Sequence, residues 1–191
     1  MEKLLHSLHS ESIIGIDGLG GSGKTTFAKE LQQKIGAVLF HLDDFIHPRH
    51  VRYNPHIEPW KLYYVHQWRY DYLIDRVLNP LKNGEEINNV IELYNKESDE
   101  YEETAVTIRK GVPVIIEGVF LQRDALRQYF DTVVYLDVDR DKRLQRVLQR
   151  DTYIGSKEAI LQKYEQRYFP AEEQYIEEYD PVANAQIVVR H

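Results

Sequence analysis

The feature that most constrains this chain is an eight-residue segment near its N-terminus, Gly18-Leu19-Gly20-Gly21-Ser22-Gly23-Lys24-Thr25. It fits the pattern G-x-x-x-x-G-K-[ST] at every position, between an apolar run at residues 12–17 and a helical pattern at residues 25–35. Glycines let the backbone curl so that successive N–H groups point inward, and the start of the following helix favours an anion. The segment therefore predicts a strand, a phosphate-binding loop and a helix in direct succession.

The polar residues of the loop indicate a nucleoside triphosphate bound together with Mg²⁺. Lys24 supplies a mobile cation for the β- and γ-phosphates, and the hydroxyl of Thr25 suits the metal ion. Chance glycine-rich turns with a lysine exist, but they lack the preceding strand and following helix. We expect the phosphates to be held by these residues: Gly18, Gly20, Gly21, Ser22, Gly23, Lys24, Thr25 and Thr26.

Short apolar runs alternate with longer helical patterns along the rest of the chain, which is typical of an α/β fold. The runs are apolar on both faces, as in a parallel sheet covered by helices on each side. Further strands are predicted at residues 37–42, 112–116, 132–138 and 185–189, and one long helix at residues 63–81. With no repeat or linker, residues 1–191 are predicted to form a single three-layer domain, with a small hairpin excursion at about 84–110.

Charge and cysteine content exclude several classes of function. The net charge is −7, whereas a general nucleic-acid binder carries a broad basic surface, so no nucleic-acid partner is expected. The absence of cysteine excludes disulfides, thiolate zinc sites and a cysteine nucleophile. No apolar run is long enough to cross a bilayer, so we expect a cytoplasmic protein without a membrane partner. A homo-oligomer is left open.

Carboxylates follow two of the predicted strands, where the ligand crevice of an open α/β sheet lies. Asp43 and Asp44 come after the strand at 37–42, and Glu117 after the strand at 112–116. A kinase acting on a hydroxyl needs a carboxylate to orient the acceptor and take its proton, and Asp43 suits that task. Glu117 suits the binding of Mg²⁺, with Asp43 as a further candidate ligand. Asp44 is interpreted as a helix cap or a turn residue.

Three arginines share one face of a predicted helix after the strand at 132–138. Arg143, Arg146 and Arg150 are spaced three and four residues apart. Guanidinium groups held over a phosphoryl-transfer site stabilise the charge of the moving group, so these arginines are candidate catalytic residues. We expect a lid at about 143–160 that closes over the triphosphate. The same spacing also fits a solvated helix with ion pairs.

Two clusters between the second and third predicted strands are interpreted as structural. Five histidines between positions 41 and 66 lack the spacing of a zinc site, so no metal site is predicted there. The aromatic residues between 60 and 72 are expected to pack in the core, with one or two rings free to stack on a base or sugar.

In order and spacing these pieces resemble the uridine kinase-like family, within the phosphoribulokinase and uridine kinase group of P-loop kinases. Besides the loop, the matching motifs are Leu42-Asp43-Asp44-Phe45 (D-x-F), the stretch 77–84 (V-L-x-P-L-x-x-G), Ile115-Ile116-Glu117-Gly118 (E-G), the segment 143–151 (R-L-x-R…R-D) and the tail 164–172. The resemblance implies a P-loop NTPase fold with a small lid, and ATP and Mg²⁺ as cofactors. It also implies Asp43 as the acceptor-activating base, Glu117 as a magnesium or catalytic acid, and lid arginines.

Three departures from the family pattern concern the acceptor and the lid. Uridine kinases carry a Tyr-Asp-Phe segment followed by a histidine that reads the pyrimidine, whereas this chain has Tyr94-Asn95-Lys96, with Asp99 near the histidine position. Their lid has paired arginines where this chain has Arg146-Val147, and after Asp151 only Lys157 is nearby. Uridine specificity therefore does not follow from the resemblance.

The expected activity is transfer of the γ-phosphoryl of ATP to a hydroxyl of a small molecule. A nucleoside such as uridine or cytidine is the leading acceptor, and nicotinamide riboside, pantothenate or a sugar derivative are alternatives. A nucleotide-dependent switch is a rival of another class. A guanine-specific switch would carry N-K-x-D, which the segment Asn95-Lys96-Glu97-Ser98 fails at its last position.

Overall fold

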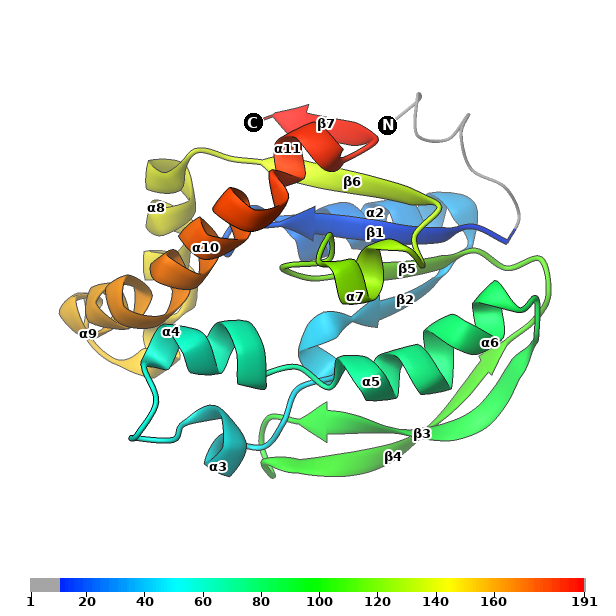
Figure 1. The fold of residues 1–191 in the computed structure, drawn as a ribbon, viewed down its shortest axis with the longest axis horizontal. Coiled ribbons are helices and arrows are strands. Elements are labelled where there is room, and N and C mark those ends of the chain that lie inside the picture. The colour runs from blue at the N-terminus through cyan, green and yellow to red at the C-terminus, as the bar shows by residue number, and fades with distance from the viewer. Residues whose placement is uncertain (1–10, 191) are drawn as a thin grey trace.

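A parallel five-stranded sheet forms the centre of the computed structural model, which describes residues 11–190 (Figure 1). The strand order is β2-β5-β1-β6-β7, and every neighbouring pair is parallel. The strands are β1 (Ile13–Gly18), β2 (Val38–His41), β5 (Val114–Glu117), β6 (Thr132–Asp137) and β7 (Ile187–Arg190). Each strand predicted from an apolar run is present, so the predicted α/β class is confirmed. Residues 1–10 and 191 of the predicted single domain lie outside the described residues.

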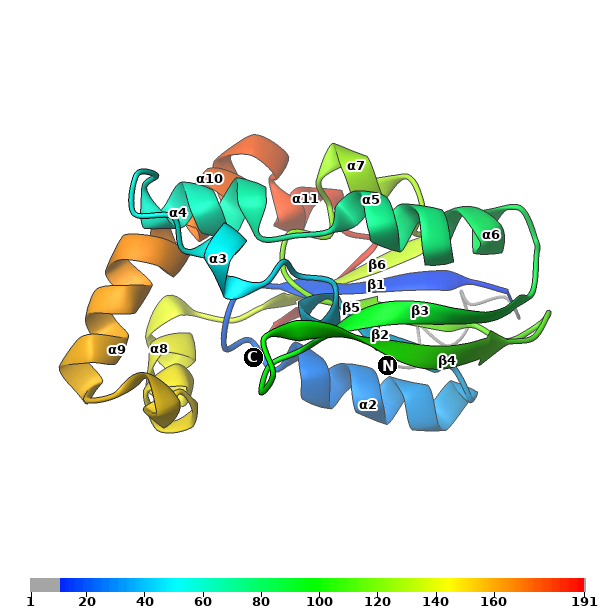
Figure 2. The same ribbon diagram turned by 90° about the horizontal axis from the view of Figure 1, so that it is seen from below.

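Helices cover both faces of the sheet, as predicted from strands that are apolar on both sides (Figure 2). Helix α2 (Lys24–Ile35) covers one face, where Ala28 and Leu31 are buried against Ile14, Ile115 and Leu136. Short helices and the helix before β7 cover the opposite face. The result is a three-layer arrangement with the sheet in the middle.

The remaining helical segments are short, and several run into one another through π-helical turns. They are α3 (Arg49–Arg52), α4 (Pro59–Lys61), α5 (Tyr70–Leu73), α6 (Asn79–Lys82), α7 (Asp124–Arg127), α8 (Arg140–Arg150), α9 (Lys157–Lys163), α10 (Phe169–Tyr179), α11 (Pro181–Asn184), the π-helical turns η2 (Leu62–His66), η3 (Ile74–Leu78) and η5 (Tyr164–Tyr168), and the 3-10 turns η1 (Leu42–Asp44) and η4 (Thr152–Ile154). Within residues 11–190, no helix has both the length and the apolar character that a membrane span requires.

The prediction of a single long helix at residues 63–81 is wrong, because the helical conformation is interrupted at residues 67–69. Trp68 forms a β-bridge with Ile46, and the N–H of Arg69 donates to the carbonyl of Phe45 at 2.8 Å. These bonds to a segment more than 20 residues away replace the intrahelical bonds that continuity would give. The break separates α4 and η2 from α5, η3 and α6, and it places residue 67 on the wall of the cavity described below.

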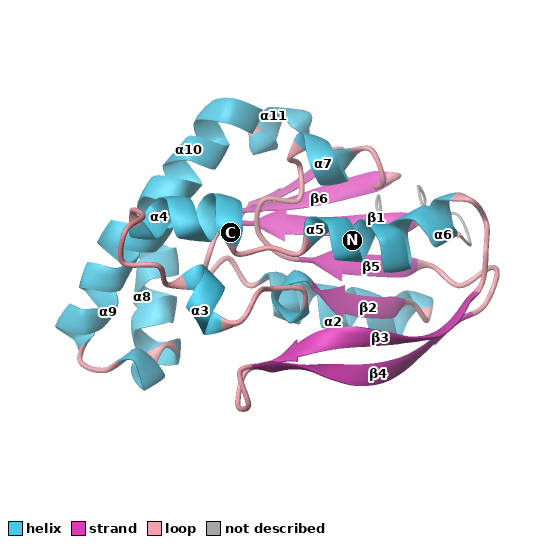
Figure 3. Cartoon of the chain, turned by 60° about the horizontal axis from the view of Figure 1, so that its bottom comes forward, coloured by secondary structure: helices cyan, strands magenta, loops and turns pink. Residues whose placement is uncertain are grey.

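The region expected to make a small excursion forms an antiparallel hairpin, β3 (Ile87–Asn95) and β4 (Glu100–Ile108). It is a separate two-stranded sheet that lies alongside the β2 edge of the main sheet (Figure 3). Its residues Ile87, Ile91 and Tyr94 are buried. Helices α8 and α9 lie past the carboxyl ends of the central strands (Figure 1). The hairpin tip and these helices therefore flank the edge at which the ligand crevice of such a sheet forms.

Candidate active site

The phosphate loop joins β1 to α2, and its glycines are required by backbone geometry. Gly21 has φ of 79°, and a Cβ placed there would lie 2.8 Å from the carbonyl oxygen of Arg143. Gly18 has φ of 149°, and a Cβ there would lie 2.9 Å from the carbonyl oxygen of Leu136. Any side chain at either position would meet backbone atoms while forcing a conformation that only glycine adopts easily. The loop is therefore packed tightly between the strand ends and α8.

The residues of the loop fit a bound phosphate and a magnesium ion. Ser22 Oγ is buried and has no hydrogen-bond partner within residues 11–190, so a donor is available inside the loop. The N–H groups in the first turn of α2 lack intrahelical partners, as at any helix start. Thr25 and Glu117 offer the hard oxygen ligands that Mg²⁺ prefers. The part of the chain that the structure describes holds no group of three or more His, Cys, Asp or Glu side chains that could by themselves hold a metal ion.

Lys24 begins α2 and lies in the centre of the site. Its Nζ donates to the carbonyl of Leu19 at 3.0 Å, and the residue is buried. Burial lowers the pKa of its ammonium, while the carboxylates of Glu117, Asp17 and Asp43 oppose that change. The ammonium is thus surrounded by acids within a confined space. An arriving phosphate anion would meet a cation that is poorly hydrated and therefore interacts strongly.

Glu117, the last residue of β5, is brought to the loop by the parallel pairing of β5 with β1. Its Oε1 accepts from the Thr25 hydroxyl at 3.0 Å and lies 2.6 Å from Nδ1 of His41. Burial acts to raise the pKa of Glu117, but the hydrogen bond to His41 and the ammonium of Lys24 outweigh it and lower that pKa. The same bond raises the pKa of His41. The two candidate magnesium ligands therefore touch, and Glu117 is held ionised.

Asp43 follows β2 in the short turn η1 and lines the same cavity as Lys24, Thr25 and Glu117. Desolvation by the surrounding protein raises the pKa of its carboxyl, and the nearby charge of Glu117 raises it further. A carboxyl with a raised pKa is a stronger base when ionised, which suits removal of a proton from an alcohol. Asp44 ends the same turn, in keeping with its interpretation as a turn residue.

The three arginines of α8 contact different parts of the protein. Arg143 is 5% exposed and pairs with Glu172 at 2.9 Å, while also donating to the carbonyl of Gly20 at 3.0 Å. Arg146 donates to the carbonyls of Gly21 and Ser22. Both guanidinium groups therefore support the phosphate loop from its outer side, and neither residue lines the cavity.

Arg150 is the member of the set that lines the cavity. It forms a two-point ion pair with Asp151, with Nε 2.6 Å and Nη2 3.1 Å from its carboxylate oxygens. Tyr164 also donates to Asp151 at 2.7 Å. The segment from α8 to α9, predicted as a lid, thus presents one arginine to the site rather than a face of three.

Sequence reasoning missed Glu172, which lies on α10 and lines the cavity. Its Oε1 accepts from the N–H of Gly20 at 2.8 Å, and its Oε2 pairs with Arg143. Burial raises the pKa of Glu172, and Arg143 opposes that rise. The tail segment 164–172 carried a signal as a matching motif, but nothing in its spacing indicated a contact with a loop 152 residues away.

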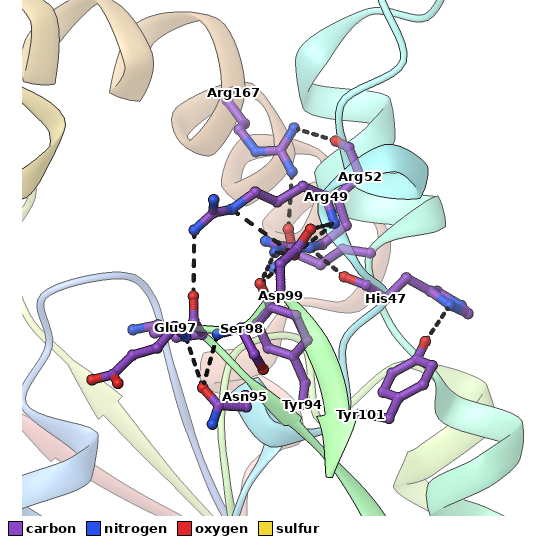
Figure 4. Close-up of polar contacts among 12 residues, drawn as sticks. His47, Arg49, Arg52, Tyr94, Asn95, Glu97, Ser98, Asp99, Tyr101 and Arg167 are labelled. Carbon is purple, nitrogen blue, oxygen red and sulfur yellow. Dashed lines mark hydrogen bonds and ion pairs between the residues drawn. The ribbon is translucent and has the colours of Figure 1, made fainter.

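Another part of the cavity wall is built by α3 and the tip of the β3–β4 hairpin (Figure 4). Arg52 donates to the carbonyl of His47 and to the hydroxyl of Tyr94, the latter at 2.7 Å. Tyr94 donates to Asp99 at 2.7 Å, and Asp99 accepts from the backbone N–H of Arg49 at 2.9 Å. Asp99 is near the position at which the uridine kinase pattern has a base-reading histidine. Here its carboxylate instead links the hairpin to α3 by hydrogen bonds.

The cavity has a volume of about 830 Å³ and connects the two regions. Gly20, Gly21, Lys24 and Thr25 line one part of it, and residues of α3, of the hairpin tip and of η5 line the other. A space of this size is in the range of small-molecule sites. Asp43 lines the same cavity, so one open space is in contact with both the loop and the candidate base.

Comparison with known proteins agrees with this geometry. The sequence matches the phosphoribulokinase/uridine kinase family over residues 13–190. Uridine kinase of Staphylococcus aureus is 29% identical over 178 residues, which cover 89% of this chain and 84% of that protein. A solved structure described as a possible uridine kinase from Bacillus stearothermophilus superposes with a TM-score of 0.75 at 33% identity, covering 93% of this chain and 87% of that one. The chain belongs to the phosphoribulokinase/uridine kinase family, and it is an ATP-dependent phosphotransferase of the P-loop kinase class.

Proposed function

We propose that the protein transfers the γ-phosphoryl of ATP to a hydroxyl of a small molecule, with Mg²⁺ as cofactor. The observation that carries the proposal is the shared cavity, which Lys24 and Thr25 of the phosphate loop line together with Asp43. A phosphoryl donor held at the loop and an alcohol near Asp43 would meet in this one cavity. An acceptor that fills the space beside the loop displaces water, which favours transfer to the alcohol over hydrolysis.

In the proposed reaction Asp43 accepts the proton of the acceptor hydroxyl. The hydroxyl oxygen forms a bond to the γ-phosphorus, the bond from that phosphorus to the β,γ-bridging oxygen breaks, and ADP leaves with the electron pair. Lys24 would neutralise phosphate charge, and Arg150, a lid residue that lines the same cavity, would add to this. Thr25 and Glu117 would hold Mg²⁺, which supplies charge stabilisation on the phosphates. Arg143 and Arg146 act indirectly, by holding the loop in shape.

A nucleoside such as uridine or cytidine is the first acceptor to test, because the relatives are named for uridine phosphorylation. Nicotinamide riboside, pantothenate and sugar derivatives are the alternatives. Tyr53, Tyr63, Tyr94 and Tyr168 line the cavity and offer rings on which a planar base would stack.

The test is incubation of the protein with ATP, Mg²⁺ and a panel of hydroxyl compounds, with product detection by mass spectrometry. We expect at least one compound to gain a phosphoryl group at a rate that exceeds ATP hydrolysis without acceptor. The Asp43→Asn variant should bind ATP normally and fail in transfer. Slow ATP hydrolysis that no acceptor accelerates, and that a protein partner regulates, would contradict the proposal in favour of a nucleotide-dependent switch.

A further inference from the structure

Building on the proposed phosphoryl transfer, we infer that the acceptor is an alcohol that also carries an anionic group, a carboxylate or a phosphate monoester. The anion would be bound beside Tyr53 by Arg52 and Lys163, in the field of Arg167. This specifies the substrate class of the proposed site and differs from the neutral nucleoside that the names of the relatives suggest.

Arg167, on η5, is a buried cation that has no counter-charge among the described residues. The residue is 3% exposed, and its guanidinium donates to the carbonyls of Arg52 and Pro59 and to Oε1 of Gln67 at 2.9–3.2 Å. Within residues 11–190 its Nε has no hydrogen-bond partner, and it forms no ion pair with a carboxylate. A buried charge that only neutral groups solvate is costly to the folded protein. An anion bound nearby would offset that cost.

Tyr53 marks the place where the cations converge. The guanidinium carbons of Arg52 and Arg167 lie 5.5 and 4.5 Å from the centre of its ring, and Nζ of Lys163 lies 5.7 Å from it. Burial acts to raise the pKa of the Tyr53 hydroxyl, but Lys163, Arg167 and Arg52 outweigh it and bring that pKa below its ordinary value. Tyr53 is 45% exposed, and both Tyr53 and Lys163 line the cavity. The positive field therefore reaches the open space.

Three of the four carboxylates that line the cavity are engaged elsewhere, and the fourth, Asp43, is the proposed base. Asp151 is paired with Arg150, Glu172 with Arg143, and Glu117 with His41 and Thr25. Asp99 is 3.8 Å from Arg52 and accepts hydrogen bonds from the hairpin and α3, and it does not line the cavity. Lys163, like Arg167, has no carboxylate partner in the described part of the chain. The excess of positive charge is thus left for a ligand.

The hydrogen-bonding groups of this wall also favour an electron-rich ligand. Oε1 of Gln67 accepts from Arg167, so the amide NH₂ of Gln67 is the end left for the cavity that this residue lines. Lys163 and Arg52 add further donors. Hydrogen-bond donors alone would also suit the carbonyl groups of a neutral pyrimidine. The uncompensated positive charge, however, favours binding of an anion over binding of a neutral ligand. A cationic acceptor such as nicotinamide riboside would be repelled.

The triphosphate of the donor is the competing explanation for these cations. The phosphate loop, Lys24 and Arg150 would serve the donor. Arg52 of α3 and Lys163 of α9 instead lie on either side of the cavity wall at Tyr53. Loss of Lys163 should therefore change the KM for the acceptor and leave the KM for ATP unchanged. That split separates the two explanations.

The test compares alcohols in matched pairs that differ in charge: glycerol with D-glycerate, pantothenol with pantothenate, and ribulose with ribulose 5-phosphate. Uridine, cytidine and nicotinamide riboside complete the panel, and ADP formation and product mass are measured for each. We expect the anionic member of at least one pair to have a kcat/KM about tenfold or more above its neutral partner and above the nucleosides. The carboxylate pairs and the phosphate pair tell which anion is used.

Lys163→Met is then compared with Lys34→Met, which removes an exposed lysine from the last turn of α2 that does not line the cavity. Lys163→Met should lower kcat/KM for the anionic acceptor about tenfold, with the KM for ATP and the circular dichroism spectrum unchanged, and Lys34→Met should have no effect. Preference for a neutral or cationic acceptor, or an effect of Lys163→Met on ATP alone, would overturn the inference while the proposed function stands. If no compound in the panel is phosphorylated, the proposed function fails and the inference fails with it.

Discussion

Replacing Arg143 with methionine tests the buried contact that holds the phosphate loop against α8 and α10. Nη1 of Arg143 lies 2.9 Å from Oε2 of Glu172, and the two side chains are 6% and 3% exposed. Glu172 in turn accepts from the N–H of Gly20 at 2.8 Å. Methionine fills much of the same space with a flexible apolar chain, but it leaves the carboxylate buried without its counter-charge.

The magnitude follows from the geometry of the pair. Removing one partner of a buried ion pair costs about 3–5 kcal/mol, because the remaining charge is uncompensated. Arg143 also donates to the carbonyls of Gly20 and Val138, which adds to the loss. Protonation of Glu172 in the variant limits this loss of stability, since burial raises the pKa of that carboxyl. We expect a loss of about 3–5 kcal/mol in the free energy of unfolding, which corresponds to a Tm lower by about 6–20 °C for a chain of this size.

Urea unfolding of a double-mutant cycle is the appropriate assay. Glu172→Gln should lower the free energy of unfolding of the otherwise unchanged protein and leave it nearly unchanged in the Arg143→Met background. The two results would give a coupling energy of about 2 kcal/mol or more. Arg140→Met is the matched control, because Arg140 lies on the same helix in an exposed ion pair with Glu173 and should cost less than about 1 kcal/mol. A cost below about 1 kcal/mol for Arg143→Met, or purely additive costs, would refute the role given to the pair.

Three further predictions concern the proposed chemistry. Asp43→Asn should retain ATP binding and lower turnover by about two orders of magnitude or more, and unchanged turnover in a steady-state assay would remove Asp43 as the base. Lys24→Ala should severely weaken triphosphate binding or catalysis, as judged by nucleotide titration against Lys29→Ala, an exposed lysine of the same helix. Because desolvation raises the pKa of Asp43 and the base must be ionised, kcat should fall as pH drops through that raised pKa, at a pH above the ordinary aspartate range. A pH–rate profile whose acid limb lies at the ordinary aspartate value would contradict this.

Features specified by local pattern could be predicted from the sequence. The phosphate loop needs only glycines at set positions, a strand before it and a helix after it, and each of these is read within about 20 residues. The carboxyl-end placement of Asp43 and Glu117 follows from parallel pairing, so their approach to the loop could also be anticipated.

Features that depend on distant partners could not be predicted. The helix expected at residues 63–81 breaks because Trp68 and Arg69 bond to the segment after β2, and nothing in their own spacing shows this. The shared face of Arg143, Arg146 and Arg150 was read from periodicity, but periodicity does not say what that face meets. Arg143 meets Glu172 on α10, 29 residues onward, and so becomes buried.

The bonds between Asp99, Tyr94 and α3 have a consequence for how such an enzyme diversifies. The phosphate-loop end of the cavity is made by the turn between β1 and α2, by α2 and by the end of β5, whereas this wall is made by α3 and the hairpin tip. Under the proposed function, substitutions at the hairpin tip should change which alcohol fits while the phosphate loop itself is unchanged. Exchange of residues 94–99 between relatives is a direct route to new acceptors in protein engineering, provided that the incoming tip still fastens to α3.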